Sequence, residues 1–405
     1  MEKLEVTFRI VTPMFLGGAD PNIQAELREA SVKGALRFWY RAIDPDYLIN
    51  EARIFGGSGK GEGQSLFLLR ISGRRTAKTE WILDKQLQYL AFPFKMKQNK
   101  RYLSESVKED ENLLLTLLFK DAPENSLDRK RIIASLWLLG HFGGLGSRSR
   151  RGFGTIALLK WKAQSGTWDE MTELPILHKQ STPENWNDTL KQALQVLKAW
   201  FPGDRIPDHA IFNSNSRFKL VETAENDNRA ALKKAAALMQ KFRSRRNIKD
   251  QDSDYHRVKA HYCYKDKKAG DVGRSLKNPV VAKELKTTID RAAFGLPLTI
   301  NYSSLGYKQR ENERGPIFDR NGNPVMYPVG TTYEGTEHTR SASRIHIRIV
   351  KIRDNFYPLF IRMDGPLLAT NEKLKGKKWG TFAAPTNQIL DDFWTEIKTD
   401  LEVVW

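Results

Sequence analysis

Residues 128–161 have the sequence DRKRIIASLWLLGHFGGLGSRSRRGFGTIALLKW, in which three patterns follow one another. From Asp128 to Gly140, apolar residues recur at the three- and four-residue spacing of a helix face. Between Gly143 and Gly154, five glycines and three arginines occur within twelve residues. Residues 155–161 are rich in apolar side chains suited to a strand. The stretch therefore predicts a helix with a broad apolar face, a glycine-rich loop and a strand. That face consists of Ile132, Ile133, Leu136, Trp137 and Leu139.

The segments that precede this stretch complete a recognisable order of elements. Apolar side chains alternate with polar ones over residues 4–10, which is typical of a half-buried strand. A helix is predicted over residues 31–42 with Ser31 as its N-cap, and strands are predicted over residues 65–71 and 113–119. Strand, helix, strand, strand, helix, loop, strand is the order of a ferredoxin-like (RRM-like) unit. The first half therefore predicts an α+β fold.

The second half also mixes helix and strand patterns. Thr182 and Pro183 predict a helix start, with proline at the first helical position. The elements expected after it are a strand at 211–221, a basic helix at 228–242, a charged insertion at 243–277, a helix from Asn278-Pro279, a loop at 307–339 and a strand pair at 345–363. We therefore expect two domains, residues 1–162 and 182–405, and a second ferredoxin-like unit fits the latter.

Charge and cysteine content narrow the class of protein. The chain of 405 residues has 66 Lys plus Arg against 48 Asp plus Glu, a formal net charge of +18. Such an excess favours a polyanionic partner, although a merely soluble basic protein has the same composition. The single cysteine, Cys263, excludes an internal disulfide and a cysteine-cluster metal site. No apolar run is long enough to span a membrane, so we expect a cytoplasmic location.

The segment from Gly143 to Gly154, named the glycine–arginine loop from here on, has the chemistry of a phosphate site. Glycine permits a close approach of backbone to ligand, and successive backbone N–H groups form an anion-binding concavity. Arg148, Arg150 and Arg151 can bind phosphate oxygens bidentately. The alternative is an ordinary solvent loop. Long loops between well-patterned elements are usually functional, and this favours phosphate binding.

A second basic feature lies on the predicted helix at residues 31–42. Lys33, Arg37 and Arg41 follow one another at intervals of four residues and so form one stripe, named the helix stripe from here on. A separate apolar stripe, from Val32 to Ile43, can pack against a sheet. The helix stripe could present three cations to a backbone of phosphates, or it could be the solvated face of an amphipathic helix.

Other segments resemble known motifs but lack residues that those motifs require. Residues 56–61 resemble a P-loop, but Gly61 stands where the motif needs Ser or Thr. Arg151–Gly154 matches the start of the RNP1 signature, but Thr155 and Leu158 occupy its aromatic positions. The spacings of His256, His261 and Cys263, and of the aspartates from Asp250 to Asp254, match no known metal site. We therefore expect no metal and no cofactor.

Three blocks resemble the RAMP superfamily of CRISPR-associated proteins. They are the Thr12-Pro13 turn with Gly17-Gly18, the helix segment SVKGALRFWYR at residues 31–41, and the glycine–arginine loop. The resemblance is closest to the family of subunit one of the Cmr (type III-B) effector complex. Phe294–Pro297 and Arg340–Arg344 are similar to later blocks of that family.

The resemblance implies two ferredoxin-like RAMP domains with loop insertions. It also implies a non-catalytic, RNA-binding subunit for antiviral defence. Such a subunit contacts the 3′ region of the guide (CRISPR) RNA and the target RNA, beside other Cmr subunits. Carried over position by position, the RNA contacts are Lys33, Arg37, Arg41, Arg148, Arg150 and Arg151, with the loop shaped by Gly143, Gly144, Gly146, Gly152 and Gly154.

Two alternatives remain open from the sequence. Some RAMP proteins are metal-independent endoribonucleases that process guide RNA, and His141, just before the glycine–arginine loop, is the candidate base. A histidine at a helix end can equally cap carbonyls or pack. The second alternative is a protein scaffold, since the basic segment Asn228–Arg246 suits an acidic protein partner as well as RNA.

Overall fold

The computed structural model describes most of the chain, and the described part has an α+β fold. The described residues are 2–17, 26–73, 77–78, 85–92, 102–103, 112–121, 123–164, 168–203, 208–244, 289–307, 327–376 and 380–405. Helices and antiparallel sheets alternate along these segments, so the fold class predicted from the sequence is confirmed.

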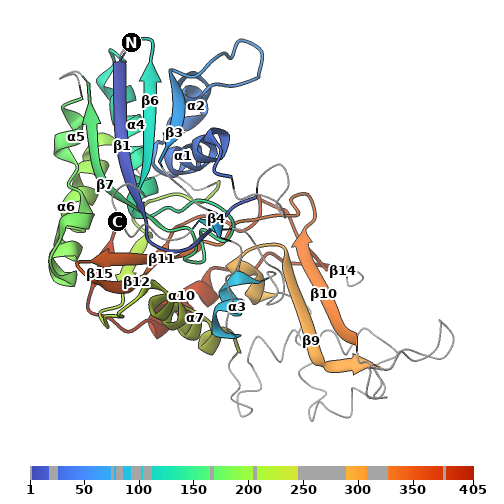
Figure 1. Ribbon diagram of the computed structural model, residues 1–405. Coiled ribbons are helices and arrows are strands. Elements are labelled where there is room, and N and C mark those ends of the chain that lie inside the picture. Colours follow the sequence, from blue (N-terminus) through green and yellow to red (C-terminus); the bar gives the residue numbers. More distant parts are fainter. Residues whose placement is uncertain are drawn as a thin grey trace. The chain divides into compact units, whose positions relative to one another are not determined.

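Four strands of the first half form an antiparallel sheet in the order β3-β6-β1-β7 (Figure 1). Their bounds are β1 (Glu2–Ile10), β3 (Phe67–Ser72), β6 (Leu113–Phe119) and β7 (Ile156–Ala163). The two connecting helices, α1 (Glu29–Ile43) and α4 (Ser126–His141), pack against each other. When the strands are numbered by their order in the chain, their order across the sheet is 2-3-1-4. This is the strand order of a ferredoxin-like sheet, as predicted.

The same arrangement recurs in the second half. The second sheet has the order β11-β12-β8-β15, which is again 2-3-1-4 in chain order, and all its pairs are antiparallel. Its strands are β8 (Arg217–Leu220), β11 (Ile345–Ile352), β12 (Asn355–Arg362) and β15 (Glu402–Val404). Helix α7 (Asn228–Ser244) follows β8 in the chain and α10 (Gln388–Glu396) precedes β15. The second ferredoxin-like unit is thus confirmed.

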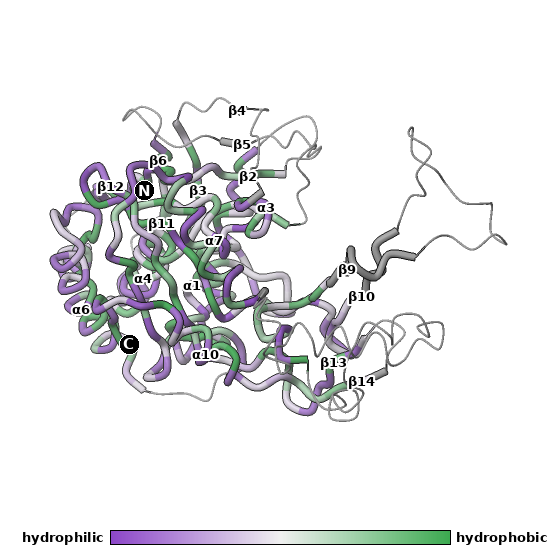
Figure 2. Tube along the Cα trace, turned by 90° about the horizontal axis from the view of Figure 1, so that it is seen from below, coloured by the Kyte–Doolittle hydropathy of each residue, from purple (hydrophilic) through white to green (hydrophobic). Residues whose placement is uncertain are grey.

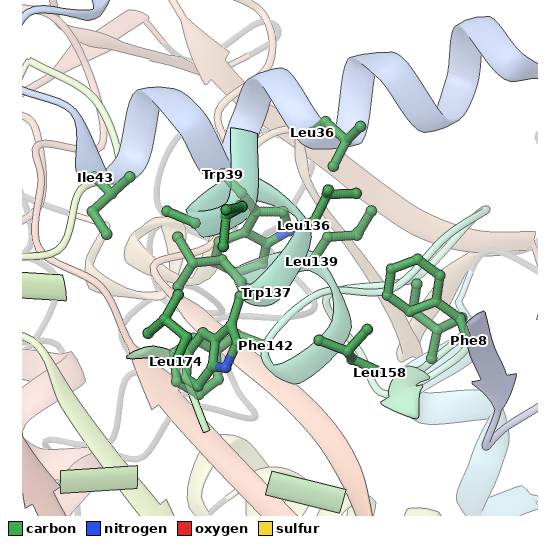
Figure 3. Packing of buried hydrophobic residues seen from close by; sticks show 14 of the residues in the cluster. Phe8, Leu36, Trp39, Ile43, Leu136, Trp137, Leu139, Phe142, Leu158 and Leu174 are labelled. Atoms are coloured by element: carbon green, nitrogen blue, oxygen red, sulfur yellow. The ribbon is translucent and has the colours of Figure 1, made fainter. Parts of the chain in front are cut away.

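A continuous apolar core lies between the first sheet and its helices (Figure 3). Trp137 of α4 is fully buried in it, and its indole donates a hydrogen bond of 2.8 Å to the Pro175 carbonyl. Gly140 allows the close approach of α4 to the sheet, because a Cβ there would lie 2.6 Å from the Leu158 Cβ and 2.7 Å from the Phe8 ring. The end of α4, where the glycine–arginine loop begins, is therefore fixed against both β1 and β7.

Contacts divide the chain into two compact units. Unit 1 comprises residues 1–239, 345–365 and 397–405, and it holds both ferredoxin-like sheets. Unit 2 comprises residues 240–344 and 366–396. The predicted domain boundaries at residues 162 and 182 stay a prediction.

Unit 1 has several further short elements and one long helix. They are β2 (Met14–Phe15), α2 (Tyr47–Phe55), β4 (Ala77–Lys78), α3 (Lys85–Ala91), β5 (Tyr102–Leu103), α5 (Glu170–Glu173), a 3₁₀ helix (Leu177–Lys179) and α6 (Pro183–Trp200). Helix α6 begins as predicted, because the Thr182 hydroxyl accepts a hydrogen bond from the Asn185 amide. Hydrophilic and hydrophobic residues alternate along α6 in Figure 2, as its buried side chains recur at helical spacing.

Unit 2 has its own sheet, in the order β14-β13-β10-β9. Its elements are a 3₁₀ helix (Asp290–Phe294), β9 (Leu298–Tyr307), β10 (Tyr327–Gly335), β13 (Leu374–Gly376) and β14 (Gly380–Phe382), together with α10. The aromatic rings of Phe242, Phe294 and Phe393 pack against one another, with centroids 5.3–6.2 Å apart.

Several local predictions were wrong. Helix α1 begins at Glu29 with Arg28 as its N-cap, not at Ser31, since the Ser31 and Val32 amides already donate to the Arg28 carbonyl. Helix α2 was not predicted at all. The loop expected over residues 307–339 contains strand β10, which pairs with β9 and β13. The helix expected from Asn278 and almost all of the charged insertion at 243–277 lie outside the described residues.

Candidate nucleic-acid interface

The glycine–arginine loop is held by the segment that follows β1. Thr12 is fully buried, and its hydroxyl donates to the Gly152 carbonyl at 2.7 Å and accepts from the Thr155 amide at 2.9 Å. The Gly154 amide donates to the Pro13 carbonyl at 2.8 Å, and the Ser147 amide donates to the Phe15 carbonyl at 2.7 Å. Both arms of the loop are therefore tied to residues 12–15, the turn that forms the first block of the resemblance.

Close packing explains why glycine occupies the loop positions. Gly146 has φ +83°, and a Cβ there would lie 2.4 Å from the Phe15 carbonyl oxygen. Gly154 has φ +63°, and a Cβ there would lie 1.9 Å from the Leu145 carbonyl oxygen. A side chain at either position would thus break the loop, in addition to the strain of a left-handed backbone. The other glycines predicted to shape the loop, Gly143, Gly144 and Gly152, are crowded in the same way.

Arg348 of β11 ties the second sheet to the start of the loop. Arg348 is 4% exposed, and its guanidinium donates hydrogen bonds to the carbonyls of Gly143 at 2.7 Å, Gly140 at 2.6 Å and Ile156. Burial lowers the pKa of this guanidinium to about 9. The sequence analysis missed Arg348, although its place within the alternating pattern of Ile345, Ile347 and Ile349 was a signal that it lies on a fixed strand.

The loop also adds backbone contacts to β11. The Ile347 amide donates to the Arg150 carbonyl at 3.0 Å, and Arg151 and Ile347 form a parallel bridge. Because β11 belongs to the second ferredoxin-like sheet, both sheets of unit 1 fix the conformation of one loop. The alternative of an unanchored solvent loop does not fit these contacts.

The three loop arginines have different surroundings. The Arg151 guanidinium lies 3.1 Å from the Met239 sulfur of α7. The Arg150 guanidinium lies over the Phe38 ring of α1, 4.7 Å from its centroid, and Arg148 has a left-handed backbone with φ 65°. Within the described part of the chain, neither Arg148 nor Arg150 forms an ion pair with a carboxylate. Partial burial lowers the pKa of both guanidinium groups. These two cations are therefore partly dehydrated and not neutralised.

The helix stripe is engaged with neighbouring elements of its own unit. The Lys33 ammonium donates to the Ser65 hydroxyl at 2.7 Å and lies 5.0 Å from the centre of the Phe67 ring. Arg37 donates to the carbonyls of Phe55, at 2.9 Å, and Gly56 at the end of α2. Burial, and then the charge of Arg37, lower the pKa of Lys33.

Glu51 of α2 neutralises the other end of the helix stripe. Glu51 is 9% exposed, and its carboxylate accepts hydrogen bonds of 2.5 and 2.6 Å from Arg41 and one of 3.4 Å from Arg37. The hydrogen bonds that Arg41 donates to the Glu51 carboxylate raise the pKa of Arg41. The structure therefore places Arg37 and Arg41 of the helix stripe against α2, where they hold two helices together, and places the loop arginines elsewhere.

A pocket opens between the adjacent side of α1, the glycine–arginine loop and β11. Its volume is about 180 Å³. We name it the helix–loop pocket, and its lining consists of Gly34, Ala35, Phe38, Trp39, Phe142, Gly143, Gly144, Ser149, Arg150 and His346. Phe38 and His346 lie with ring centroids 5.9 Å apart and planes inclined by 29°. The sequence analysis missed this pocket, because His346 is remote from α1 in the chain.

His141, the candidate base, lies inside unit 1. Its ring is 4% exposed and its centroid is 4.6 Å from that of Trp137. Burial, together with the charges of Arg348 and His178, holds its pKa well below 6.5. A cavity of only about 10 Å³ adjoins it. A phosphodiester has no room to reach this imidazole.

Metal and membrane features were searched in the described residues only. No group of three or more His, Cys, Asp or Glu side chains there could hold a metal ion. No described helix is long and apolar enough to cross a membrane. His256, His261, Cys263 and the aspartates at 250–254 lie outside the described residues.

Comparison with known proteins adds to this geometry. Residues 7–157 match the sequence model of the RAMP superfamily. This part of the chain is a RAMP domain. It contains the Thr12-Pro13 turn, the helix stripe and the glycine–arginine loop, so the resemblance derived from those blocks is confirmed.

Curated relatives of this chain come from Pyrococcus furiosus. The CRISPR system Cmr subunit Cmr1-1 is 22% identical over 179 residues, which are 42% of this chain and 50% of that protein. Subunit Cmr1-2 is 28% identical over 172 residues, which are 36% of this chain and 89% of that protein. The chain thus spans about half the length of the first of these relatives.

A solved structure shows the same fold. The crystal structure of Cmr1 from Pyrococcus furiosus, in its apo form, aligns with a TM-score of 0.52 and 18% identity. The alignment covers 90% of this chain and 88% of that one. The likeness therefore extends beyond the matched RAMP domain and includes most of the second half.

Proposed function

We propose that this RAMP protein is a non-catalytic, RNA-binding subunit of a type III-B (Cmr) CRISPR RNA-guided effector, serving antiviral defence in the cytoplasm. Its partners are the guide (CRISPR) RNA, the target RNA and other Cmr subunits. It contacts the 3′ region of the guide and the target. The likeness to the Cmr1 subunits of Pyrococcus furiosus supports this assignment to an effector.

The observation that carries the proposal is the state of Arg148 and Arg150. Both lie on a loop fixed at both arms, and neither has a carboxylate partner among the described residues. A guanidinium that is already partly dehydrated and already positioned loses little entropy or hydration when a phosphate binds. These two arginines are therefore the principal phosphate contacts, joined by Arg151 at the same loop.

The helix stripe contributes less in this proposal. Arg37 and Arg41 already share the Glu51 carboxylate, so a phosphate would have to compete with a bound anion. Lys33 keeps its hydrogen bond to Ser65 and has no carboxylate partner among the described ion pairs, so it is the stripe residue best placed to contact RNA. Recognition of this kind concerns backbone and shape, with sequence supplied by pairing between guide and target.

The burial of His141 supports the non-catalytic part of the proposal. A general base must come within hydrogen-bond reach of the hydroxyl that it deprotonates. His141 is 4% exposed and lies beneath the Arg348 clamp of the loop, so the endoribonuclease alternative lacks its candidate residue. The scaffold alternative has less support, because Lys234 of the basic helix α7 is already paired with Glu225 at 2.9 Å.

The test is binding of end-labelled single-stranded RNA across a salt series, in EDTA, by wild type and an Arg148→Ala/Arg150→Ala variant. The matched control is Lys160→Ala/Lys162→Ala, which removes two exposed charges from β7. Each lost phosphate contact lowers the slope of log affinity against log salt by roughly 0.7, so we expect a fall of about 1.4 for the loop variant and little change for the control.

Three results would contradict the proposal. Equal losses in the loop variant and the control would mean that binding depends on net charge alone. Absence of binding at low salt would favour the protein scaffold. Cleavage of the RNA in EDTA, abolished by His141→Ala, would favour the nuclease.

A further inference from the structure

The helix–loop pocket has aromatic walls and a cationic rim. Trp39 and His346 are 3% and 2% exposed and form part of its floor, while Phe38 is half-buried at its side. The Arg150 guanidinium lies over Phe38 at the rim, next to Ser149. None of the described lining residues is acidic. The pocket therefore suits a flat, polarisable group attached to an anion.

Its size suits one such group. An engineered apolar cavity of about 150 Å³ accepts benzene. The helix–loop pocket has a volume of about 180 Å³, so it can take a single six-membered ring.

Gly34 indicates that the pocket is kept open. It lies in the middle of α1, where glycine is less favourable than alanine. A Cβ at Gly34 would meet no atom within 4 Å, and the residue is exposed, so packing among the described residues does not require glycine here. The loop glycines differ, since each is crowded by neighbouring atoms. No contact within the described chain therefore requires glycine at position 34. The space beside Gly34 is available to a bound ligand.

We infer that the helix–loop pocket holds one unstacked base of a single-stranded RNA, against the Phe38 and His346 rings and the Arg150 guanidinium. Single-stranded bases stack on aromatic rings and on arginine planes, and this stacking tolerates any sequence. The phosphates that flank the base would then meet Arg150 and Arg148 on the same loop. This inference rests on the proposed RNA binding and adds contact with a base to contact with the backbone.

The aromatic rings of the helix–loop pocket do not come from the strand that carries an RNP1 motif. After the loop, the RNP1 stacking positions are not aromatic, since the buried residues Thr155 and Leu158 occupy them. Phe38 comes from α1, and His346 comes from β11 of the other sheet. The pocket therefore forms only where elements of both ferredoxin-like sheets meet at the loop.

The experiment compares two labelled probes of about twelve nucleotides, which is within the usual site size for single strands. One is oligouridylate and the other is the same backbone without bases, with the same number of phosphates. Fluorescence anisotropy gives the affinity of each probe. We expect wild type to bind oligouridylate about tenfold more tightly than the abasic probe, in line with one stacked base.

Two variants remove the base contact by different means. Phe38→Leu deletes the stacking ring, and Gly34→Leu fills the pocket from a position where added atoms meet nothing. The control Gln192→Leu makes the same kind of change at an exposed position of α6. We expect both pocket variants to bind the two probes equally, at the wild-type affinity for the abasic one, while the control keeps the tenfold preference.

The outcomes separate this inference from the proposed function. If both pocket variants keep the wild-type preference for oligouridylate, the base site is wrong although backbone binding stands. If wild type binds both probes equally, the base site is likewise wrong. If wild type binds neither probe at low salt, the proposed function fails, and the inference fails with it. Should Phe38→Leu not fold, Gly34→Leu decides alone, because its change leaves the core untouched.

Discussion

The helix stripe and the glycine–arginine loop have the same number of cations but opposite surroundings. In the stripe, Arg37 and Arg41 share the Glu51 carboxylate and Arg37 also binds carbonyls of α2. In the loop, Arg148 and Arg150 have no carboxylate partner among the described residues, while the backbone beneath them is bonded at both arms. Arg37 and Arg41 are therefore used within the protein, whereas we propose that Arg148 and Arg150 bind an anion.

The comparison teaches that a run of positive charge does not by itself mark a binding surface. When an arginine pairs with a carboxylate of the same protein, the positive charge of the arginine is already balanced. A cation that the fold positions and leaves without a counter-ion has its charge available for an anion. Stability and RNA affinity should therefore respond to changes in different residues.

The largest effect is expected for Arg348→Met. Methionine fills a similar space but leaves the carbonyls of Gly140, Gly143 and Ile156 without this donor, and each unpaired buried carbonyl costs roughly 1–3 kcal/mol. Urea unfolding should show a loss of about 3 kcal/mol, against no measurable change for the exposed control Lys198→Met. A variant as stable as wild type would mean that the loop needs no clamp from the second sheet.

A smaller loss is expected for Glu51→Gln. It removes the counter-charge of two arginines that are partly exposed, so we expect a loss of about 2 kcal/mol by urea unfolding. RNA affinity should not fall and should depend more steeply on salt, since Arg37 and Arg41 are released. A loss of RNA affinity at unchanged stability would reverse the roles assigned to the two regions.

Acid should weaken the helices but not the loop. Asp128 of α4 is 3% exposed, and although burial raises its pKa, hydrogen bonds from Arg53 and Arg131 outweigh this and lower the pKa below 3.8. A lowered folded-state pKa contributes stability that is present above about pH 4, the unfolded value, and is lost as pH falls through the folded value. The free energy of unfolding, measured with urea from pH 6 to pH 3, should therefore fall by about 1 kcal/mol more in wild type than in Asp128→Asn. Parallel profiles would show that this carboxylate does not contribute.

The smallest change in stability is expected for Arg148→Ala/Arg150→Ala. Neither side chain has a carboxylate partner among the described residues, so their removal should change the unfolding free energy by less than about 0.5 kcal/mol. The same variant has the largest expected effect on the salt dependence of RNA binding. A loss of several kcal/mol would show that these arginines are structural, like those of the helix stripe.

Regular patterning explains which elements could be predicted. The alternation over residues 4–10 and the helical spacing in α4 predicted elements that the structure contains. Helix α2 escaped prediction because Leu48 and Ile49 are 78% and 80% exposed, so its apolar residues do not follow the buried face. Strand β10 escaped because pairing with β9 and β13 stabilises a segment whose own sequence favours a loop.

The sequence by itself determined the order of the strands and of the two main helices in the first ferredoxin-like unit, the loop with its five glycines and three arginines, and the spacing of the helix stripe. Only the tertiary structure decided which cations are paired and where a pocket opens. Arg348 contacts Gly143 across 205 residues, and His346 meets Phe38 of α1. The physical reason is that spacing along a helix or strand is local, whereas the pairing and dehydration of a charge depend on which distant atoms the fold brings within a few ångströms.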